Sequence, residues 1–383
     1  MDITIQPGKL SGLVQAIPSK SLVHRYLICA AFAATSTTLI CPESNRDIQA
    51  TVDCLQALGA EIQRTESGYS VSPIRHIPEN ATLNCCESGS TLRFLLPIVG
   101  ALGVDATFQM EGRLPQRPLS PLWEEMERMG CSLSRPTENT LHCSGQLKAG
   151  QYSIDGCVSS QFITGLLYAL PLIKGETQLT VTGKLESKPY VTMTEHALKL
   201  FQYPYSPSPE VIRVEGDWSN SAFFLAANSL GNSITVSNLN SDSPQGDRSV
   251  VHWLKELTHH CRISASDIPD LIPILSVVAA ANQGAVFTDI QRLRLKESDR
   301  VEALLEMIRN LGGQADATES TLTVCGTGLV GGTVNSHNDH RIAMSAAIAS
   351  TVCTSPVTIT GADAVNKSYP HFWEEFRRLG GKL

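Results

Sequence analysis

Positive charge is scarce in this chain. Its 383 residues contain 30 Lys and Arg against 37 Asp and Glu, which gives a formal net charge of −7. Proteins that bind nucleic acid usually present a basic face, so this balance argues against a nucleic-acid partner. A mildly acidic protein can still hold a basic cleft, so small anionic ligands remain compatible with the composition.

Long apolar runs, signal features and metal-type cysteine pairs are also missing. No run of 18 uninterrupted apolar residues occurs, and the N-terminal segment MDITIQPGKL has no charged region followed by an apolar one. None of the 11 cysteines forms a Cys-x-x-Cys pair, and most lie in apolar runs, where cysteine behaves as a small hydrophobic residue. We therefore predict a cytoplasmic, monomeric protein that uses no membrane, no metal and no cofactor.

Six amphipathic segments with similar ends recur along the chain. Helical spacing is clearest in the fifth, where Leu304, Leu305, Ile308 and Leu311 mark one face. Glycine is preferred just after a helix, and four of the six segments stop at one, namely Gly59, Gly130, Gly312 and Gly380. We therefore predict that each of the six segments forms an outer helix with one face packed on a core.

A second helix candidate, with a polar head and an apolar body, lies upstream of each amphipathic segment. The heads are PSKSLVHR, ESGSTLR, SSQFITG, GDWSNSAFF, DIPDLIP and NDHRIAM. From each head to the corresponding stop the separation is 39 to 42 residues. This near-constant spacing predicts six copies of one unit, each with a buried apolar helix, a strand pair and an amphipathic outer helix.

Six α/β units of this size predict an α/β fold with two similar domains of three units each, built on buried parallel helices. The change-over is expected near PSPEVIRVEG, residues 207–216. A repeat whose strand precedes its helix can be circularly offset, so the first strand can pair with the C-terminal half. We therefore expect domain I to comprise residues 1–19 plus 216–383, and domain II residues 20–215.

The polar heads carry a functional hint. Helix N-termini present unpaired N–H groups and partial positive charge, and so attract anions. Lys20, Ser21 and Arg25 stand in one head, and Asp339, His340 and Arg341 in another. An Arg at such a point suits a carboxylate or phosphate, which its planar fork binds with two hydrogen bonds.

The segment RLRLKESDRV, residues 292–301, is the most highly charged one. Alone, it is explained equally well by a solvated, salt-bridged helix start. Together with the charged heads at equivalent points of the repeat, it favours a site for anionic ligands in a cleft between the domains.

The ordered motifs resemble the enolpyruvyl transferases, and within them the branch that acts on shikimate 3-phosphate. The matching segments run from PSKSLVHR to NKSYPHFWEEF and include SSQFITGLLYALP, ESKPYVTMT, LRLKESDR and NDHRIAMS. The resemblance implies two domains with the active site between them. It also implies transfer of the enolpyruvyl group of phosphoenolpyruvate to the 5-hydroxyl of shikimate 3-phosphate, with release of phosphate.

The resemblance also implies residue roles. Glu297 would protonate the methylene carbon, and Asp270 would accept the hydroxyl proton with help from Lys20. Shikimate 3-phosphate would be held by Lys20, Ser21, Arg25, Ser159, Ser160, Gln161, Ser187, Tyr190, Asp270, Arg292 and Lys296. Phosphoenolpyruvate would be held by Lys20, Gly89, Arg117, Gln161, Arg300, Arg341 and Lys367.

The chain departs from the family pattern at four points, one of which is Trp218 in place of a small residue next to Asp217. The loop usually written Gly-Asn-Ala-Gly-Thr reads Cys-Glu-Ser-Gly-Ser at residues 86–90, which places the carboxylate of Glu87 near an anion unless it turns away or pairs with Arg. Arg292 stands where an Asn is common, and it suits a phosphate at least as well. The third unit is shortened after its outer helix, which predicts a missing hairpin.

Two alternative functions remain open. One is the sister activity that transfers enolpyruvate to UDP-N-acetylglucosamine, but the loop MEGRLPQRPLSP lacks the reactive Cys expected there. The other is a non-catalytic shikimate-phosphate binding domain. The presence of Glu297 together with Lys296, Arg300, Arg341 and Lys367 disfavours that reading, because binding alone would not need the acid.

Overall fold

The computed structural model describes residues 1–383 and divides into two compact units. The N-unit comprises Pro18–Val214, and the C-unit comprises Met1–Ile17 with Glu215–Leu383. Each unit encloses its own hydrophobic core. No helix has both the length and the apolar character needed to cross a membrane.

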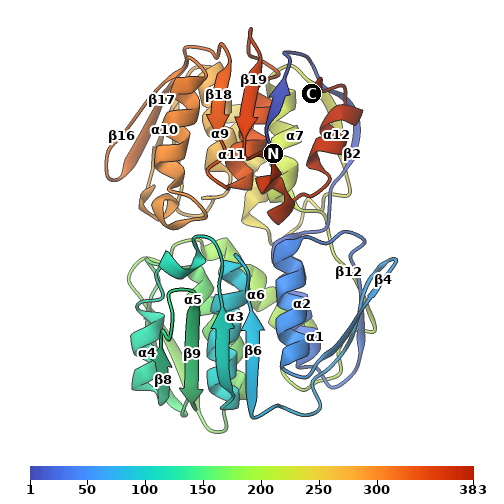
Figure 1. Cartoon of the computed structure of the whole chain (residues 1–383), viewed down its shortest axis with the longest axis vertical. Coiled ribbons are helices and arrows are strands. Elements are labelled where there is room, and N and C mark those ends of the chain that lie inside the picture. Colours follow the sequence, from blue (N-terminus) through green and yellow to red (C-terminus); the bar gives the residue numbers. More distant parts are fainter. The chain divides into compact units, whose positions relative to one another are not determined.

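Each unit contains three inner helices, and every inner helix is followed in the chain by an outer one (Figure 1). In the N-unit the inner helices are α1 (Lys20–Ala31), α3 (Gly89–Leu102) and α5 (Ser160–Ala169), and the outer ones are α2 (Arg46–Ala57), α4 (Leu122–Arg128) and α6 (Lys188–Phe201). In the C-unit the inner helices are α7 (Trp218–Ser229), α9 (Ile272–Ala281) and α11 (His340–Ala349), and the outer ones are α8 (Val250–Glu256), α10 (Arg300–Asn310) and α12 (Phe372–Arg378). The predicted sixfold repeat of helix pairs is confirmed.

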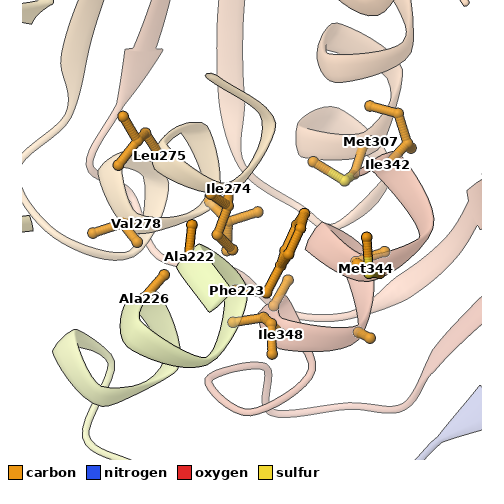
Figure 2. Packing of buried hydrophobic residues seen from close by; sticks show 14 of the residues in the cluster. Ala222, Phe223, Ala226, Ile274, Leu275, Val278, Met307, Ile342, Met344 and Ile348 are labelled. Atoms are coloured by element: carbon orange, nitrogen blue, oxygen red, sulfur yellow. The ribbon is translucent and has the colours of Figure 1, made fainter. Parts of the chain in front are cut away.

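The inner helices are buried on almost every side. Every residue of α11 is buried, and α9 is buried from Ile272 through Ala280. In the C-unit α7, α9 and α11 all pack on one another, and Phe223 of α7 points between α9 and α11 (Figure 2). A helix that is apolar on all sides can be stable only at such a position.

The strands form six small sheets. The N-unit sheets contain β3 (Thr37–Ile40), β4 (Glu61–Thr65), β5 (Gly68–Ser72), β6 (Asn80–Asn84), β7 (Asp105–Gln109), β8 (Cys131–Ser134), β9 (Thr140–Gly145), β10 (Gly150–Asp155), β11 (Thr177–Thr182) and β12 (Val211–Arg213). The C-unit sheets contain β1 (Ile3–Ile5), β2 (Ser11–Gln15), β13 (Ser233–Ser237), β14 (Cys261–Ser264), β15 (Ala285–Thr288), β16 (Gln314–Ala317), β17 (Thr321–Cys325), β18 (Gly332–Asn335) and β19 (Val357–Thr360).

The order of elements within a repeat differs from the expectation in one respect. The predicted strand pair between the two helices is wrong, because a single strand lies there. In four repeats it is parallel to the strand that precedes the inner helix, as in β6 and β7 or β14 and β15. In the first and fourth repeats the parallel pairs are instead β3 with β12 and β13 with β2. A hairpin follows the outer helix and adds antiparallel strands, giving the orders β6-β7-β9-β8 and β14-β15-β17-β16.

Three of the six sheets lack this hairpin. Two of them have only the strands β10-β11 and β13-β2, and in the sheet β1-β19-β18 the antiparallel strand is β1. The first belongs to the third repeat, where a missing hairpin was predicted, since only β12 follows α6 and it pairs with β3. The second belongs to the fourth repeat, for which the sequence predicted no such loss.

The N-terminal strands belong to sheets of the C-unit. In Figure 1 the blue β1 lies beside the red β19, to which it pairs antiparallel from Ile3–Ile359 to Ile5–Val357. The next strand, β2, pairs in parallel with β13. The chain therefore begins in the C-unit, passes into the N-unit at residue 18 and returns at residue 215.

Capping side chains mark the starts of most inner helices. Ser88, Ser159, Asp217 and Asp339 each accept a backbone N–H from the first turn of α3, α5, α7 and α11, respectively. These short polar side chains satisfy donors that would otherwise have no partner inside the helix. The polar heads thus fix where these four buried helices begin, and the charged residues beside them are fixed as well.

Candidate functional site

Charged side chains from the fifth and sixth repeats meet in the C-unit around Asp270. Asp270 lies two residues before α9, Arg300 is the first residue of α10, and Arg341 is the second residue of α11. Lys296 and Glu297 lie between the 3-10 helix η4 (Gln291–Leu295) and α10. The repeat brings these residues together because each stands at the start of a helix.

The carboxylate of Asp270 contacts three cations. Its Oδ1 is 2.7 Å from Arg300 Nη1 and 3.5 Å from Lys296 Nζ, and its Oδ2 is 3.1 Å from Arg341 Nη2. Arg341 also donates to the backbone oxygen of Asp270 at 3.1 Å. Burial alone would raise the pKa of Asp270, but Arg341, Lys296 and Arg300 outweigh it and hold the pKa of this carboxyl well below its usual range.

Arg300 binds three carboxylates and is only 1% exposed. Besides its bond to Asp270, its Nη2 donates to Glu297 Oε2 at 2.7 Å and its Nε donates to Asp339 Oδ2 at 2.8 Å. Burial opposes the charge of this guanidinium, yet Asp339, Glu297 and Asp270 raise its pKa well above the usual value. Arg300 therefore ties the start of α10 to the starts of α9 and α11.

The surroundings of Lys296 disfavour its charged form. Burial lowers its pKa to about 8, although Asp270 acts in the opposite direction. A desolvated ammonium gains more than an exposed one from a bound anion. Lys296 is therefore well suited to receive an anionic ligand. Arg292, from η4, adds to the same positive field.

Lys367 lies at the end of the 3-10 helix η5 (Ala362–Lys367), where its Nζ donates to the backbone oxygen of Asn338 at 2.7 Å. Asn338 immediately precedes Asp339, the capping residue of α11. This contact places Lys367 beside the start of α11, the helix that carries Arg341.

Two clusters occupy the N-unit, and the first surrounds the start of α1. Lys20 Nζ is 2.8 Å from Asp47 Oδ2, which stands in the first turn of α2. Arg25 donates to the backbone oxygens of Ser21 and Tyr190, both at 2.8 Å, and from its Nε to Thr194 Oγ1 at 3.0 Å. The predicted contacts Lys20, Ser21, Arg25 and Tyr190 are thus neighbours.

The second N-unit cluster surrounds Gly89 at the start of α3. A Cβ at Gly89 would lie 2.5 Å from Arg117 Nη1 and 2.8 Å from Arg93 Nη1, so both guanidinium groups lie against this backbone. Arg93 Nη1 donates to Gln161 Oε1 at 2.9 Å, and Gln161 Nε2 donates to Ser90 Oγ at 3.1 Å. Gly89, Arg117 and Gln161, predicted from distant segments, are thereby brought together.

The remaining predicted residues also lie at helix starts. Ser159 caps α5, which opens with Ser160 and Gln161. Ser187 precedes α6 with a left-handed φ of 55° and is buried. Tyr190 stands in the first turn of the same helix.

Glu87 turns toward a neighbouring loop. Its carboxylate lies so close to Gly112 that it would overlap a Cβ there, and the φ of +55° at this residue also favours glycine. The loop that contains Gly112 joins β7 to the 3-10 helix η1 (Leu114–Gln116), and Arg117 follows at once. The sequence predicts an unfavourable contact with a bound anion unless Glu87 turns away or pairs with Arg. In the structure Glu87 packs against the segment that carries Arg117.

Several site residues escaped the sequence predictions. Arg93 is 3% exposed, orients Gln161 and donates to the backbone oxygen of Pro118 at 3.0 Å. Its only signal was a charge inside the apolar run LRFLLPIVG. Asp339 was read as part of a charged head, and its bond to Arg300 was not foreseen. The other missed residues are Asp47, Thr194 and Asp247.

Asp247 stands in the 3-10 helix η3 (Gly246–Ser249) and is buried. Burial, followed by the negative charge of Asp270, raises the pKa of its carboxyl to about 6, while Arg341 acts against this rise. It thus belongs to the electrostatic surroundings of the Asp270 cluster. Nothing in its sequence context distinguished it from an ordinary surface carboxylate.

The chemical capacity of these clusters follows from their composition. Fixed cations in both units can bind carboxylate and phosphate groups with little reorganisation. Asp270 and Glu297 supply carboxyl groups next to the cations, and such groups can transfer protons. No group of three or more His, Cys, Asp or Glu side chains is arranged to hold a metal ion.

Comparison with known proteins shows that most of the chain matches one protein family. Residues 5–376 match the family described as EPSP synthase (3-phosphoshikimate 1-carboxyvinyltransferase). A 3-phosphoshikimate 1-carboxyvinyltransferase of Clostridium kluyveri is 38% identical over 418 aligned residues, covering 100% of this chain and 98% of the relative. One of Clostridium novyi is 37% identical and covers 99% of this chain and 98% of its own length.

Solved structures have the same fold. An EPSP synthase structure from Acinetobacter baumannii superposes with a TM-score of 0.79 at 23% identity, covering 99% of this chain and 98% of that one. The predicted α/β, two-domain fold is therefore confirmed. The match along nearly the whole chain, together with relatives above 30% identity, shows that this chain belongs to the EPSP synthase (3-phosphoshikimate 1-carboxyvinyltransferase) family.

Proposed function

We propose that this protein transfers the enolpyruvyl group of phosphoenolpyruvate to the 5-hydroxyl of shikimate 3-phosphate and releases phosphate, as a step toward chorismate and the aromatic amino acids. The observation that carries the proposal is the cluster of Asp270, Lys296, Glu297, Arg300 and Arg341, which joins two carboxyl groups to three cations. The family match along residues 5–376 supports the same reaction.

Anion binding is divided between the two substrates. In the C-unit, Arg300, Arg341 and Lys367 bind phosphoenolpyruvate, while Asp270, Arg292 and Lys296 face shikimate 3-phosphate. In the N-unit, Gly89, Arg117 and Gln161 serve phosphoenolpyruvate, and Lys20 contacts both substrates. The other shikimate 3-phosphate contacts are Ser21, Arg25, Ser159, Ser160, Gln161, Ser187 and Tyr190.

The reaction follows an addition and elimination sequence. Glu297 donates a proton to the methylene carbon of phosphoenolpyruvate, while the 5-hydroxyl oxygen bonds to the adjacent carbon and gives its proton to Asp270, assisted by Lys20. The resulting tetrahedral intermediate carries a methyl group, a carboxylate and the phosphate. Return of a methyl proton to Glu297 and cleavage of the bond between this carbon and the phosphate oxygen give the enol ether. The released phosphate takes the proton held by Asp270.

Substrate binding changes the basicity of Asp270. In the unliganded protein, Arg341, Lys296 and Arg300 keep the pKa of Asp270 well below its usual range. Anionic substrates that bind these cations weaken the positive field at the carboxylate. The pKa of Asp270 then rises, so this residue becomes a competent proton acceptor when both substrates are in place.

A direct assay separates this function from the sister activity. The protein is incubated with phosphoenolpyruvate and either shikimate 3-phosphate or UDP-N-acetylglucosamine, and phosphate release is followed. We expect release with shikimate 3-phosphate only. Release with UDP-N-acetylglucosamine only, or with neither acceptor, contradicts the proposal.

We also propose that the enzyme works in the cytoplasm as a monomer. All 11 cysteines are free thiols, which suits a reducing compartment. A single chain supplies every predicted substrate contact. Sedimentation at the enzyme concentration used in the assay tests the second statement, and a mass of two chains under those conditions contradicts it.

The pH dependence of kcat/KM for shikimate 3-phosphate should reveal the ionisation of Lys296. Its pKa of about 8 in the folded protein means that the ammonium is lost as the pH rises through that value. We expect kcat/KM for shikimate 3-phosphate to fall about tenfold per pH unit above this point, because kcat/KM reports ionisations of the free enzyme. The Lys296→Arg variant keeps its charge and should not show this fall. An identical fall in that variant would assign the ionisation to another group.

Replacement of Gly89 should disturb phosphoenolpyruvate binding. The added methyl of Gly89→Ala would lie 2.5 Å from Arg117 Nη1 and 2.8 Å from Arg93 Nη1, so both side chains must move. We expect kcat/KM for phosphoenolpyruvate to fall about tenfold to a hundredfold, because a small misplacement of a binding group is costly. Gly8→Ala is the matched control, because its added Cβ would meet only Gln6 O, at 4.0 Å. Equal kinetics for the two variants would contradict the assignment of Gly89.

A further inference from the structure

A chain of buried hydrogen bonds runs through three helices of the N-unit without touching a predicted substrate contact. His24 Nδ1 lies 2.7 Å from Thr51 Oγ1, Thr51 Oγ1 lies 2.7 Å from Thr91 Oγ1, and Thr91 Oγ1 donates to Ser88 Oγ at 2.7 Å. All four side chains are at most 2% exposed. The chain links α1, α2, α3 and the residue that caps α3.

The direction of these bonds follows from counting protons. The single hydroxyl proton of Thr91 goes to Ser88, so the oxygen of Thr91 accepts from Thr51. The proton of Thr51 is then used, and its oxygen must accept from His24. The Nδ1 atom of His24 therefore carries a proton.

The surroundings of His24 indicate a neutral ring with its proton on Nδ1. The Nε2 atom is buried and has no hydrogen-bond partner, as an unprotonated nitrogen in an apolar site can be. Burial lowers the pKa of the His24 ring well below its usual value, and the charges of Lys20 and Arg25 lower it further. The imidazole thus stays neutral across the physiological range, and the order of the bonds is fixed.

The position of the chain relates it to the proposed substrate contacts. Lys20 pairs with Asp47, and His24 pairs with Thr51, each across 27 residues. His24 lies four residues after Lys20 on α1, and Thr51 lies four residues after Asp47 on α2. The hydroxyl chain therefore begins one helical turn further into the N-unit than the Lys20–Asp47 ion pair. At its other end is Ser88, whose Oγ also accepts the Thr91 N–H at 3.2 Å, immediately before Gly89.

We propose that His24, Thr51 and Thr91 are positioning residues that hold the start of α3 in register with the starts of α1 and α2, so that Gly89 and Lys20 meet the same phosphoenolpyruvate. The inference rests on the proposed function for the identity of the ligand. Three short buried hydrogen bonds in series specify one arrangement of the helices, whereas apolar contacts would allow small sliding movements.

Kinetics of a hydroxyl deletion test the proposal. Thr51→Val keeps the shape of the side chain and removes the central link. We expect its KM for phosphoenolpyruvate to rise about tenfold with kcat within about threefold, since misplaced helix starts weaken ground-state and transition-state binding alike. Thr51→Ser retains a hydroxyl and should recover most of the loss.

The matched control is Thr37→Val. Thr37 lies on β3, is also buried, and donates from its Oγ1 to Ser208 Oγ at 2.6 Å. It therefore loses a comparable hydrogen bond away from the helix starts. An unchanged KM in Thr51→Val, or an equal rise in Thr37→Val, overturns the proposal, because either result reduces the chain to general stability.

A second measurement does not depend on catalysis. Nitrogen-15 NMR of the imidazole, assigned by comparison with His24→Asn, reports which ring nitrogen carries the proton. The proposal predicts the Nδ1–H form from pH 6 to 8 in wild type, and loss of protection of the Thr91 amide from hydrogen exchange in Thr51→Val. An Nε2–H form or unchanged protection overturns it. If wild type releases no phosphate from its substrates, the proposed function fails, and these spectra still decide the role of the hydroxyl chain.

Discussion

Glu297→Gln should lower kcat for phosphate release by about 10²- to 10⁴-fold, the usual contribution of a positioned acid. The amide keeps the size of the side chain and can still accept a hydrogen bond from Arg300, which binds Glu297 Oε2 at 2.7 Å. It cannot give a proton to the methylene carbon. Substrate binding should therefore change far less than turnover, and steady-state kinetics with both substrates separate the two effects.

The control for this variant is Glu302→Gln on the same helix. The side chain of Glu302 is 63% exposed and pairs with Arg294 at 2.8 Å, outside the Asp270 cluster. Its activity should equal that of wild type. A comparable kcat in Glu297→Gln and Glu302→Gln would remove Glu297 from the chemistry.

The second large effect concerns stability. Arg300→Met should lower the free energy of unfolding at pH 7 by about 3 to 5 kcal/mol, as expected when one partner of a buried ion-pair network is removed. Methionine has a similar length, so the loss arises chiefly from leaving Asp270, Glu297 and Asp339 without this guanidinium. Urea unfolding followed by tryptophan fluorescence suits the measurement, because Trp218, Trp253 and Trp373 lie in the C-unit.

The destabilisation should depend on pH in a defined direction. Asp270 has a folded-state pKa well below its unfolded value of about 4, so its contribution is present above that pH and is lost as the pH falls through the folded-state value. Removing Arg300 raises the folded-state pKa and shrinks this contribution. The difference between wild type and Arg300→Met should therefore be largest near neutral pH and smaller below pH 4.

Arg309→Met supplies the matched control. Arg309 is on the same helix, its side chain is 51% exposed, and its partner Asp316 is 92% exposed. Exposed pairs contribute between zero and about 1 kcal/mol. Equal losses in Arg300→Met and Arg309→Met would contradict the view that Arg300 organises the C-unit cluster.

The repeat could be predicted because its signals are local. The polar heads and helix stops, 39 to 42 residues apart, can each be recognised within a single unit, without knowledge of the rest of the chain. The order of strands could not be read in the same way. Strands of four residues such as β3 and β15 resemble parts of longer apolar runs, and the pairing of β1 with β19 joins residues more than 350 positions apart.

The site was predictable as a set of cations but not as a network. Lys20, Arg25 and Arg341 stand in charged heads, and Arg300 stands in the charged segment 292–301; the family motifs single out all four. Their carboxylate partners stand far along the chain, 30 residues before Arg300 for Asp270 and 39 residues after it for Asp339, so no local spacing rule connects them. Arg93 was missed for a related reason, because its role depends on Gln161 in the next repeat.

Deuterium incorporation reports directly on proton transfer at the methylene carbon. The protein is incubated with phosphoenolpyruvate and shikimate 3-phosphate in D₂O, and the mixture is followed by ³¹P and ¹H NMR. We expect inorganic phosphate together with an enolpyruvyl ether whose methylene group contains deuterium, because the intermediate passes through a methyl group before it loses a proton. Unchanged phosphoenolpyruvate, or phosphate release with no deuterium in the ether, would contradict the proposed reaction at Glu297.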